Sequence, residues 1–536
     1  MTLPRSAADV LSGHVTFEVE CIDRMYLNVY IPQLQYATGL VSYIHRHLGK
    51  PVASTAALAP VTGAFTRAVR AFAAGRQIPW VDFARGQRKD DVAQKFLAGF
   101  TGTDGVLFTG RAQEKVPLFR TRKRRRGDGT SYPWIALETG VVNQFYFYCA
   151  GDGFGPFFLK FCSYFPFNAK LCLNGNEWAK RQAARAGIGF TPLDNAFAAV
   201  DDVPALQAIC HALGPAQTGA LLRKWLAILP HPFTRADRAA GYRYDISILQ
   251  AEFSLTQVLD KPVSGRIFFE QVIRDNPGLG RPDRISLIFG RSIYRGRKNY
   301  TPGTFATRVV TDGVIPSLHV PCKHAQIKQY HKLGKALRTE TTINQTTDFG
   351  LGKRLTNLPA LRQIGYTANR RLLAVQRLSH DPITGAEVLH ATCDPIVRDD
   401  GARIPGLRLT DPRAQARLHI LPVFRLHPAG FTSRDLRALP GELLGQPPGT
   451  ITSGQATYDL RRLREHGLIE RIPRTHRYQV TDTGLRHAMF LTRAHDRVLQ
   501  TGLAQLDDPA PTALRTASRA YQAALDDLTQ RAGIAA

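Results

Sequence analysis

The sequence has few of the features that place a protein in a membrane or in a secreted class. None of its apolar runs reaches the about 18 residues that a transmembrane helix needs. Its start, MTLPRSAADV, lacks the charged and then apolar segments of a signal peptide. The 7 cysteines are odd in number and form no CxxC pair, which favours reduced thiols over a disulfide framework. We therefore expect a cytoplasmic protein with no membrane partner.

Common catalytic motifs are missing as well. The chain has no Walker phosphate loop, no GxGxxG after a strand, no GxSxG elbow and no HExxH. These absences argue against an ordinary NTPase, a nicotinamide-dependent dehydrogenase, a serine hydrolase and a zincin. We expect no cofactor, except Mg²⁺ or Mn²⁺ if the chain is a nuclease.

Acidic residues are scarce relative to basic ones. The 43 Asp and Glu residues face 70 Lys and Arg residues, so the formal net charge is +27. A chain with this charge is expected to bind a polyanion, and nucleic acid is the predicted partner. The hydrophobic content of 44% is sufficient for ordinary cores.

Residues 424–484 have the clearest local pattern. Two short helices are expected, one starting near Thr432 and one capped by Ser453, because hydroxyl side chains cap helix N-termini. Gly467 can end the second helix in a left-handed conformation, and two strands then follow around a turn at 473–476. The second helix has one buried stripe at i, i+4 and i+7 spacing: Ala456, Leu460 and Leu463.

The run DLRRLREHGLIERIPRTHRYQVTDTG resembles the winged helix-turn-helix of bacterial transcription regulators. The resemblance implies that the helix from Ser453 to His466 enters a major groove and that the hairpin contacts an adjacent phosphate strand or minor groove. We expect DNA rather than RNA, and a homodimer is an open expectation because many such regulators dimerise. A protein-docking or scaffold module is the alternative. The residues that would face nucleic acid are Gln455, Thr457, Tyr458, Arg461, Arg462 and Arg464 in the helix, and Arg471, Arg474, His476 and Arg477 in the hairpin.

Two earlier stretches bear on nucleic-acid binding. The run FRTRKRRRGDG is expected to form a solvent-exposed loop, which either is merely solvated or contacts phosphate. The aromatic segment 132–190 is expected to form strands, with a helix starting at Asn174 or Asn176. Its aromatics either stack bases or are buried in a sheet covered on both faces, and weak polar alternation favours burial. The phosphate candidates of the basic run are Arg122, Lys123, Arg124, Arg125 and Arg126.

The segment 325–344 is the candidate for chemistry. We expect a helix from Ala325 to Leu333 and a strand from Ala336 to Asn344, on which period two puts Arg338 and Glu340 on one face. In one interpretation these two side chains form an ion pair with each other in the sheet. In the other, Glu340 is a carboxylate that binds a metal or takes part in acid–base chemistry. In the second case the preceding helix would supply positive charge toward phosphate through Lys328, Lys332 and Lys335.

The segment IKQYHKLGKALRTETTIN resembles a segment of some rolling-circle replication initiators. The resemblance implies metal-assisted attack on a DNA phosphodiester, with Tyr330 as nucleophile and Glu340 as metal ligand. The paired-histidine motif of the HUH members is absent. The nearby residues His319, Cys322, His324 and His331 do not have a zinc-site spacing, so we predict no metal site there.

The whole chain, from VYIPQLQ through GNEWAKRQ and SILQAEFSLTQVL to the winged helix, resembles a family of uncharacterised bacterial proteins, which implies no activity. We predict an α+β multidomain protein with a mixed-sheet body, helical segments and a C-terminal winged-helix domain. The expected regions are 1–130, mainly helical with short strands and a basic loop; 131–262, an aromatic α/β region that is mostly helical from Asp194; 263–378, a second α/β region; 379–415, a connection; 416–506, the winged helix; and 507–536, a tail.

Overall fold

The computed structural model describes residues 13–125, 127–261, 308–312, 315–322, 324–378, 385–427, 429–443 and 450–495. The chain divides into two compact units, which we call the sheet unit and the C-terminal unit. The expected tail at 507–536 and the side chain of Arg126 lie outside the described residues. The sheet unit comprises Phe17–Thr256 and Thr342–Gln363, and the C-terminal unit comprises Met1–Thr16, Gln257–Thr341 and Ile364–Ala536.

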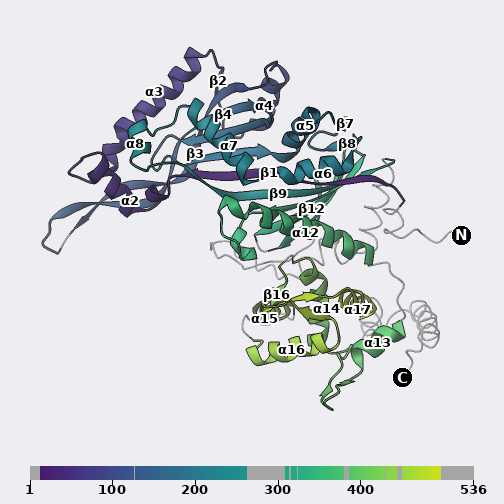
Figure 1. Ribbon diagram of the computed structural model, residues 1–536. Coiled ribbons are helices and arrows are strands. Elements are labelled where there is room, and N and C mark those ends of the chain that lie inside the picture. Colours follow the sequence, from purple (N-terminus) through teal and green to yellow (C-terminus); the bar gives the residue numbers. More distant parts are fainter. Residues whose placement is uncertain are drawn as a thin grey trace, which may run out of the picture. The chain divides into compact units, whose positions relative to one another are not determined.

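A large mixed sheet forms the body of the sheet unit (Figure 1). Its neighbouring strands pair antiparallel from β1 through β6, β5 and β4 to β3, and β2 then pairs parallel with β3. In order across the sheet the strands are β9 (Asp245–Leu259), β1 (Val15–Tyr30), β6 (Ala169–Asn174), β5 (Gly155–Cys162), β4 (Ser131–Gly151), β3 (Gly105–Arg125) and β2 (Trp80–Asp82).

The two faces of this sheet are covered to different extents. On one face Phe65 of α3 packs edge-on against Phe145, and Trp225 of α7 packs against Phe157. Residues of β5 and β6 alternate between buried and half-buried because successive side chains point to opposite faces. Burial of the aromatics is confirmed for the first face. On the second face Tyr146 and Tyr148 are also buried, in a cluster with residues of α4, whereas Phe158 is half-buried. The helices of this unit are α2 (Ala37–Ser42), α3 (Ala59–Gly75), α4 (Lys89–Ala98), α5 (Gly175–Arg185), α6 (Val203–Ala212), α7 (Pro215–Ile228) and α8 (Arg235–Ala239).

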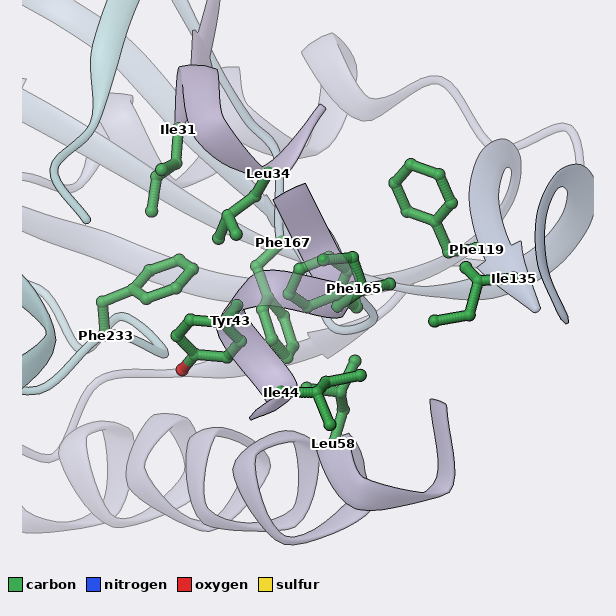
Figure 2. Packing of buried hydrophobic residues seen from close by; sticks show 11 residues of the cluster. Ile31, Leu34, Tyr43, Ile44, Leu58, Phe119, Ile135, Phe165, Phe167 and Phe233 are labelled. Atoms are coloured by element: carbon green, nitrogen blue, oxygen red, sulfur yellow. The ribbon is translucent and has the colours of Figure 1, made fainter. Parts of the chain in front are cut away.

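A cluster of buried aromatic and aliphatic side chains packs together in the sheet unit (Figure 2). Tyr43 lies in the π-helical turn η2 (Tyr43–His47), and its hydroxyl donates to the buried carboxylate of Asp237 at 3.0 Å. Phe165 packs edge-on against Phe167 from the loop after β5. The cluster thus ties the first helices to the base of the β3–β4 hairpin. Short elements around it are η1 (Pro32–Leu34), η3 (Thr55–Leu58), β7 (Phe190–Pro192) and β8 (Phe197–Val200).

Two predictions for this unit are wrong. The basic run 122–125 is the end of strand β3 and not a loop, with Arg122 opposite Trp134 in register. The expected mostly helical region from Asp194 contains α6, α7 and α8 but ends in strand β9. The run from Leu249 to Thr256 alternates apolar and polar residues, which is the period of a strand and not of a helix.

The C-terminal unit contains an antiparallel set of strands: β10 (Arg308–Asp312), β11 (Ile315–Cys322), β12 (Ala325–Lys332) and β13 (Ala336–Ile343). The helix expected from Ala325 to Leu333 is wrong, because this segment is β12 and its residues alternate between buried and half-buried. The apolar residues Ala325 and Ile327 have the period of two that a strand requires. This alternation predicts the strand better than the spacing of the lysines predicts a helix. The elements that follow are η4 (Thr346–Phe349), η5 (Leu355–Asn357) and α12 (Leu358–Leu378).

The remainder of the C-terminal unit is a helical region with a small sheet. Figure 1 shows α14, α15, α16 and α17 gathered around the short strand β16, which forms a three-stranded sheet in the order β16-β18-β17. The expected connection 379–415 contains a helix, α13, as well as turns. The elements are α13 (Gly385–Cys393), β14 (Ile396–Val397), β15 (Arg403–Ile404), α14 (Pro412–Arg425), β16 (Phe431–Thr432), α15 (Ser433–Leu443), α16 (Ser453–Glu465), β17 (Ile469–Arg471), β18 (Arg477–Val480) and α17 (Asp482–Ala494).

Candidate nucleic-acid interface

The N-cap of helix α16 lies one residue earlier in the chain than expected. Thr452, not Ser453, is the N-cap: its hydroxyl accepts from the amide of Gln455 at 3.2 Å. The side-chain oxygen of Gln455 in turn accepts from the amide of Thr452 at 3.0 Å, which completes a capping box. Gln455 therefore has a structural role at the start of the helix, and its exposed side chain keeps the amide NH₂ for other contacts.

A buried ion-pair network fixes the rotation of α16 about its axis. Ala456 and Leu463 are fully buried, and Asp459 lies on the same buried stripe with 2% of its surface exposed. Its carboxylate pairs with the guanidinium groups of Arg417 and Arg413 on α14, the latter at 3.0 Å. Burial raises the pKa of Asp459 and lowers the pKa of Arg417 to about 10. Because Asp459 and Arg417 are both buried, rotation of α16 would leave a buried charge without its partner.

The opposite side of α16 is exposed. Tyr458 has half of its surface in solvent, at 50%, and Arg461 and Arg464 are exposed as expected. Arg464 donates to Glu465 at 3.0 Å and thereby lowers the pKa of that carboxyl. The exposed Thr457 donates its hydroxyl to the backbone of Ser453 at 3.0 Å. Tyr458, Arg461 and Arg464 are thus the side chains of this face best placed to reach a ligand.

Arg462 does not belong to that face, which corrects its assignment from the sequence. Its Nε donates to the carbonyl of Pro405 at 2.8 Å, and its Nη2 donates to the carbonyl of Gly406. The side chain is half-buried against the segment before α14. Helical spacing places Arg462 at the border between the buried stripe and the exposed face, and the nearby carbonyls decide which side its guanidinium takes.

The β17–β18 hairpin presents fewer free arginines than the sequence suggests. Arg471 donates to the carbonyl of Thr475 at 2.8 Å, and Arg477 donates to the carbonyl of Ala429 at 2.7 Å. Arg474 sits at the tip with a positive φ of 59° and is exposed, and His476 beside it is also exposed. Arg474 is therefore the hairpin residue best placed to reach beyond the domain.

A second basic surface lies on the sheet unit. The β3–β4 pairing continues to the turn, from Arg120 opposite Ala136 to Arg125 opposite Ser131. Arg122, Lys123, Arg124 and Arg125 are exposed along it. Arg122 forms a bidentate ion pair with Glu138 at 2.6 and 2.8 Å, and Arg124 lies 5.4 Å from the ring of Trp134, which is 46% exposed. This ribbon combines guanidinium groups with an exposed indole.

The candidate chemical site is brought together as an ion-pair cluster. Arg338, which is fully buried, donates to Glu340 at 2.6 Å, and the Tyr330 hydroxyl donates to the same oxygen at 2.8 Å. This is the first of the two arrangements considered above, in which Arg338 and Glu340 satisfy each other. Tyr330 and Glu340 are thus neighbours on adjacent strands.

The three lysines expected on one helix lie on strand β12 and in the turn after it. Lys328 lies 4.6 Å from the ring of Tyr330, Lys332 is buried at 8% exposure, and Lys335 is exposed in the turn before β13. Period two puts Lys328 and Lys332 on the face of β12 that carries Tyr330, whereas Lys335 lies beyond the strand. In the part of the chain that the structure describes, no three His, Cys, Asp or Glu side chains are grouped so that they could hold a metal ion.

The comparisons with known proteins give no family. No family model matches the chain, and no match is found among curated proteins or among solved structures. Within the described ranges, no helix has the length and apolar character needed to cross a membrane. The six cysteines whose side chains are described are free thiols.

Sequence reasoning missed the residues that orient α16. Asp459 is three residues after Ala456 and four before Leu463, so the spacing already places it on the buried stripe. A carboxylate at such a position requires a partner. Its partners Arg413 and Arg417 have the spacing of one turn on α14, two helices earlier in the chain, which is the signal that could have identified them.

Proposed function

We propose that residues 412–494 form a winged helix that binds duplex DNA through α16, with DNA preferred over RNA. The element order supports this proposal: one helix, a short strand, two helices, a two-stranded hairpin and a final helix, with β18 paired between β16 and β17. In such a module the helix before the hairpin is the one that enters the major groove. That helix is α16.

The observation that carries the proposal is the division of α16 into two faces. Its buried face is held by the Asp459 ion pairs, and its opposite face presents Tyr458, Arg461 and Arg464 to solvent. A rigid helix with exposed guanidinium groups suits contacts to phosphates and to guanine edges. Arg474 at the hairpin tip would then contact an adjacent phosphate.

The β3–β4 ribbon supports a second, sequence-independent contact. Arg124 and Arg125 are exposed on a two-stranded element, on which Arg122 is paired with Glu138, and Trp134 adds a flat apolar surface beside Arg124. Guanidinium groups spaced along a ribbon can neutralise successive phosphates. In this proposal α16 reads the site, and the ribbon increases affinity for any duplex.

A metal-dependent nuclease, the alternative function, requires Glu340 to hold a cation. In the sheet Glu340 instead accepts from Arg338 and Tyr330, which favours a structural role. A scaffold module, the other alternative, would bind a protein through the same exposed face of α16. A homodimer would present two such helices to a two-fold symmetric site, and sedimentation of the protein with and without duplex measures this directly.

The test compares two double variants with equal loss of charge. Arg461→Ala with Arg464→Ala removes two exposed guanidinium groups from α16. Arg67→Ala with Arg223→Ala removes two exposed ones from helices α3 and α7 of the sheet unit. Duplex affinity is measured by fluorescence anisotropy across a salt series, first with random-sequence DNA and then with DNA that co-purifies with the protein.

We expect the α16 variant to bind more weakly and with a flatter salt dependence. Each lost phosphate contact reduces the slope of log K against log salt by about 0.9, so two contacts reduce it by about 1.8. The control variant should keep the wild-type slope. Equal affinities and equal slopes for the two variants would show that α16 is a docking helix for another kind of partner.

A further inference from the structure

The half-buried face of the sheet unit brings two lysines directly opposite each other. In the antiparallel register Lys160 of β5 faces Lys170 of β6, and Lys170 faces Asn28 of β1. Residues opposite each other in this way have Cβ atoms about 5 Å apart, and like charges so placed are destabilising. The two ammonium groups therefore repel each other unless a negative charge lies beside both.

The two lysines differ in their partners. Lys160 donates to Glu114 at 2.8 Å. Burial alone would lower the pKa of Lys160, but its interactions with Tyr26 and Glu114 outweigh burial and raise that pKa. Lys170 donates to the neutral side chain of Asn28 at 2.8 Å. Among the residues that the structure describes, no carboxylate pairs with Lys170. Burial, followed by the charges of Lys160 and Lys353, lowers the pKa of Lys170 to about 8.

The acidic groups of this face are engaged elsewhere. Glu114 accepts from Lys160, from Lys89 at 3.1 Å and from the hydroxyl of Tyr146. Glu252 and Asp90 act on the charge of Arg24, two rows along the strands from Lys170, and on the thiol of Cys172 in the row between. The charges that act on Lys170 itself are those of Lys160 and Lys353. Lys170 is thus a half-buried cation with an amide beside it and two cations around it, which is the arrangement of an anion site.

An aromatic row lies next to the lysine row. Phe158 of β5, Cys172 of β6 and Tyr26 of β1 stand opposite one another, two residues along from Lys160, Lys170 and Asn28. That step is about 6.8 Å along a strand. The ring centroids of Tyr26 and Phe158 are 6.3 Å apart, and both side chains are half-buried. Aromatic rings beside cations on a sheet are the means by which proteins hold bases and phosphates of single strands.

We propose that Lys160 and Lys170 bind the phosphate group of a nucleotide unit whose base lies on Tyr26 and Phe158. The ligand is a nucleotide, either free or within a single-stranded nucleic acid. The site belongs to the sheet unit alone and does not depend on the winged-helix proposal. It assigns a role to a lysine pair that has a repulsive geometry and that the α16 interface does not use.

Lysine acylation of the full-length protein tests the site directly. At pH 8 Lys170 has a substantial unprotonated fraction, so it should react readily with an amine-specific reagent. Mass spectrometry then measures how far Lys170 is acylated when the solution contains inorganic phosphate, thymidine monophosphate, oligothymidylate or none of these probes. The chain has no lysine after Lys353, so this readout does not respond to occupancy of α16.

Protection of Lys170 by at least fivefold is the expected result. Protection by thymidine monophosphate as well as oligothymidylate identifies a free nucleotide as a sufficient ligand, whereas protection by oligothymidylate alone identifies a nucleic-acid strand. Protection by inorganic phosphate at the same concentration as the monophosphate would overturn the role of the aromatic row. Equal acylation with and without all three probes at low salt would overturn the proposal.

A charge-matched pair of variants gives a second test. Lys170→Gln should weaken oligothymidylate binding about tenfold and reduce the salt slope by about 0.7, the value for one phosphate contact on a single strand. Lys170→Arg should retain binding. The control is Lys224→Gln on α7, a helix that packs against the other face of the sheet through Trp225 and Phe157.

Equal oligothymidylate affinities of folded Lys170→Gln and Lys224→Gln would contradict the proposal, with circular dichroism checking the fold. The α16 double variant separates the two binding sites. If duplex binding is unaffected in Arg461→Ala with Arg464→Ala, the winged-helix proposal fails. Protection of Lys170 by oligothymidylate then still decides the proposal of a nucleotide site at Lys160 and Lys170.

Discussion

Replacing Asp459 by Ala should unfold α16 locally, because it leaves a buried cation without its partner. Arg417 has 2% of its side chain exposed, and it shares the carboxylate of Asp459 with Arg413. Removing one partner of a buried ion pair costs about 3–5 kcal/mol. Arg413 is 32% exposed and can turn to water, so most of this cost falls on Arg417. A cost of this size corresponds to a change of about a hundredfold to five-thousandfold in the opening equilibrium.

Hydrogen exchange measured by mass spectrometry is the suitable assay. The four tryptophans are at 80, 134, 178 and 225, so tryptophan fluorescence does not report on residues 412–495. We expect amides of α16 to lose at least a hundredfold of their protection in Asp459→Ala. Protection of β5 and β6 in the sheet unit serves as the internal control and should not change, since local opening is confined to the affected region.

The double variant Asp459→Leu with Arg417→Met distinguishes a buried-charge effect from lost packing. Exchange of a whole buried pair for apolar side chains of similar volume is often neutral or stabilising, so the double variant should recover most of the protection. A loss of less than tenfold in Asp459→Ala would refute the reasoning. Protection in the double variant as poor as in the single variant would refute it equally.

Two further predictions concern packing and the alternative function. A Cβ on Gly484 would lie 1.9 Å from the carbonyl oxygen of Leu468, so Gly484→Ala should destabilise the helical region by about 3 kcal/mol. A Cβ on Gly454 would meet nothing within 4 Å, so Gly454→Ala should be neutral or slightly stabilising. Hydrogen exchange measures both effects. Glu340→Gln should cost about 3 kcal/mol in thermal unfolding because Arg338 loses its charged partner; the nuclease alternative instead predicts loss of Mg²⁺-dependent cleavage of single-stranded DNA at unchanged stability.

Patterns confined to one element were predictable from the sequence. The stripe of Ala456, Leu460 and Leu463 is buried, and Gly467 has the positive φ of a helix C-cap, at 68°. Both follow from spacing and backbone sterics within about four residues. The strand β13 and the pairing of Arg338 with Glu340 also follow, because period two put them on one face.

Features set by distant residues were not predictable in this way. The segment 325–332 has charged residues compatible with either helix or strand, and its pairing with β11 decides for strand. Arg122 to Arg125 form part of β3 because β4 runs opposite them, which no local pattern indicates. The juxtaposition of Lys160 and Lys170 depends on the register between two strands, and a shift of one residue would put them on opposite faces.

The basic composition therefore says less about individual contacts than about the field around the protein. Arg462 and Arg477 donate to backbone carbonyls, and Arg417 pairs with a buried carboxylate. Their charges still add to the potential that attracts a polyanion, but their N–H groups are occupied within the fold. Arg461 and Arg474 are exposed and can add direct contacts to that attraction. Steering by the net charge of +27 and the recognition proposed for α16 are thus separate properties. The salt series tests for phosphate contacts at α16, while comparison of duplex sequences tests for recognition.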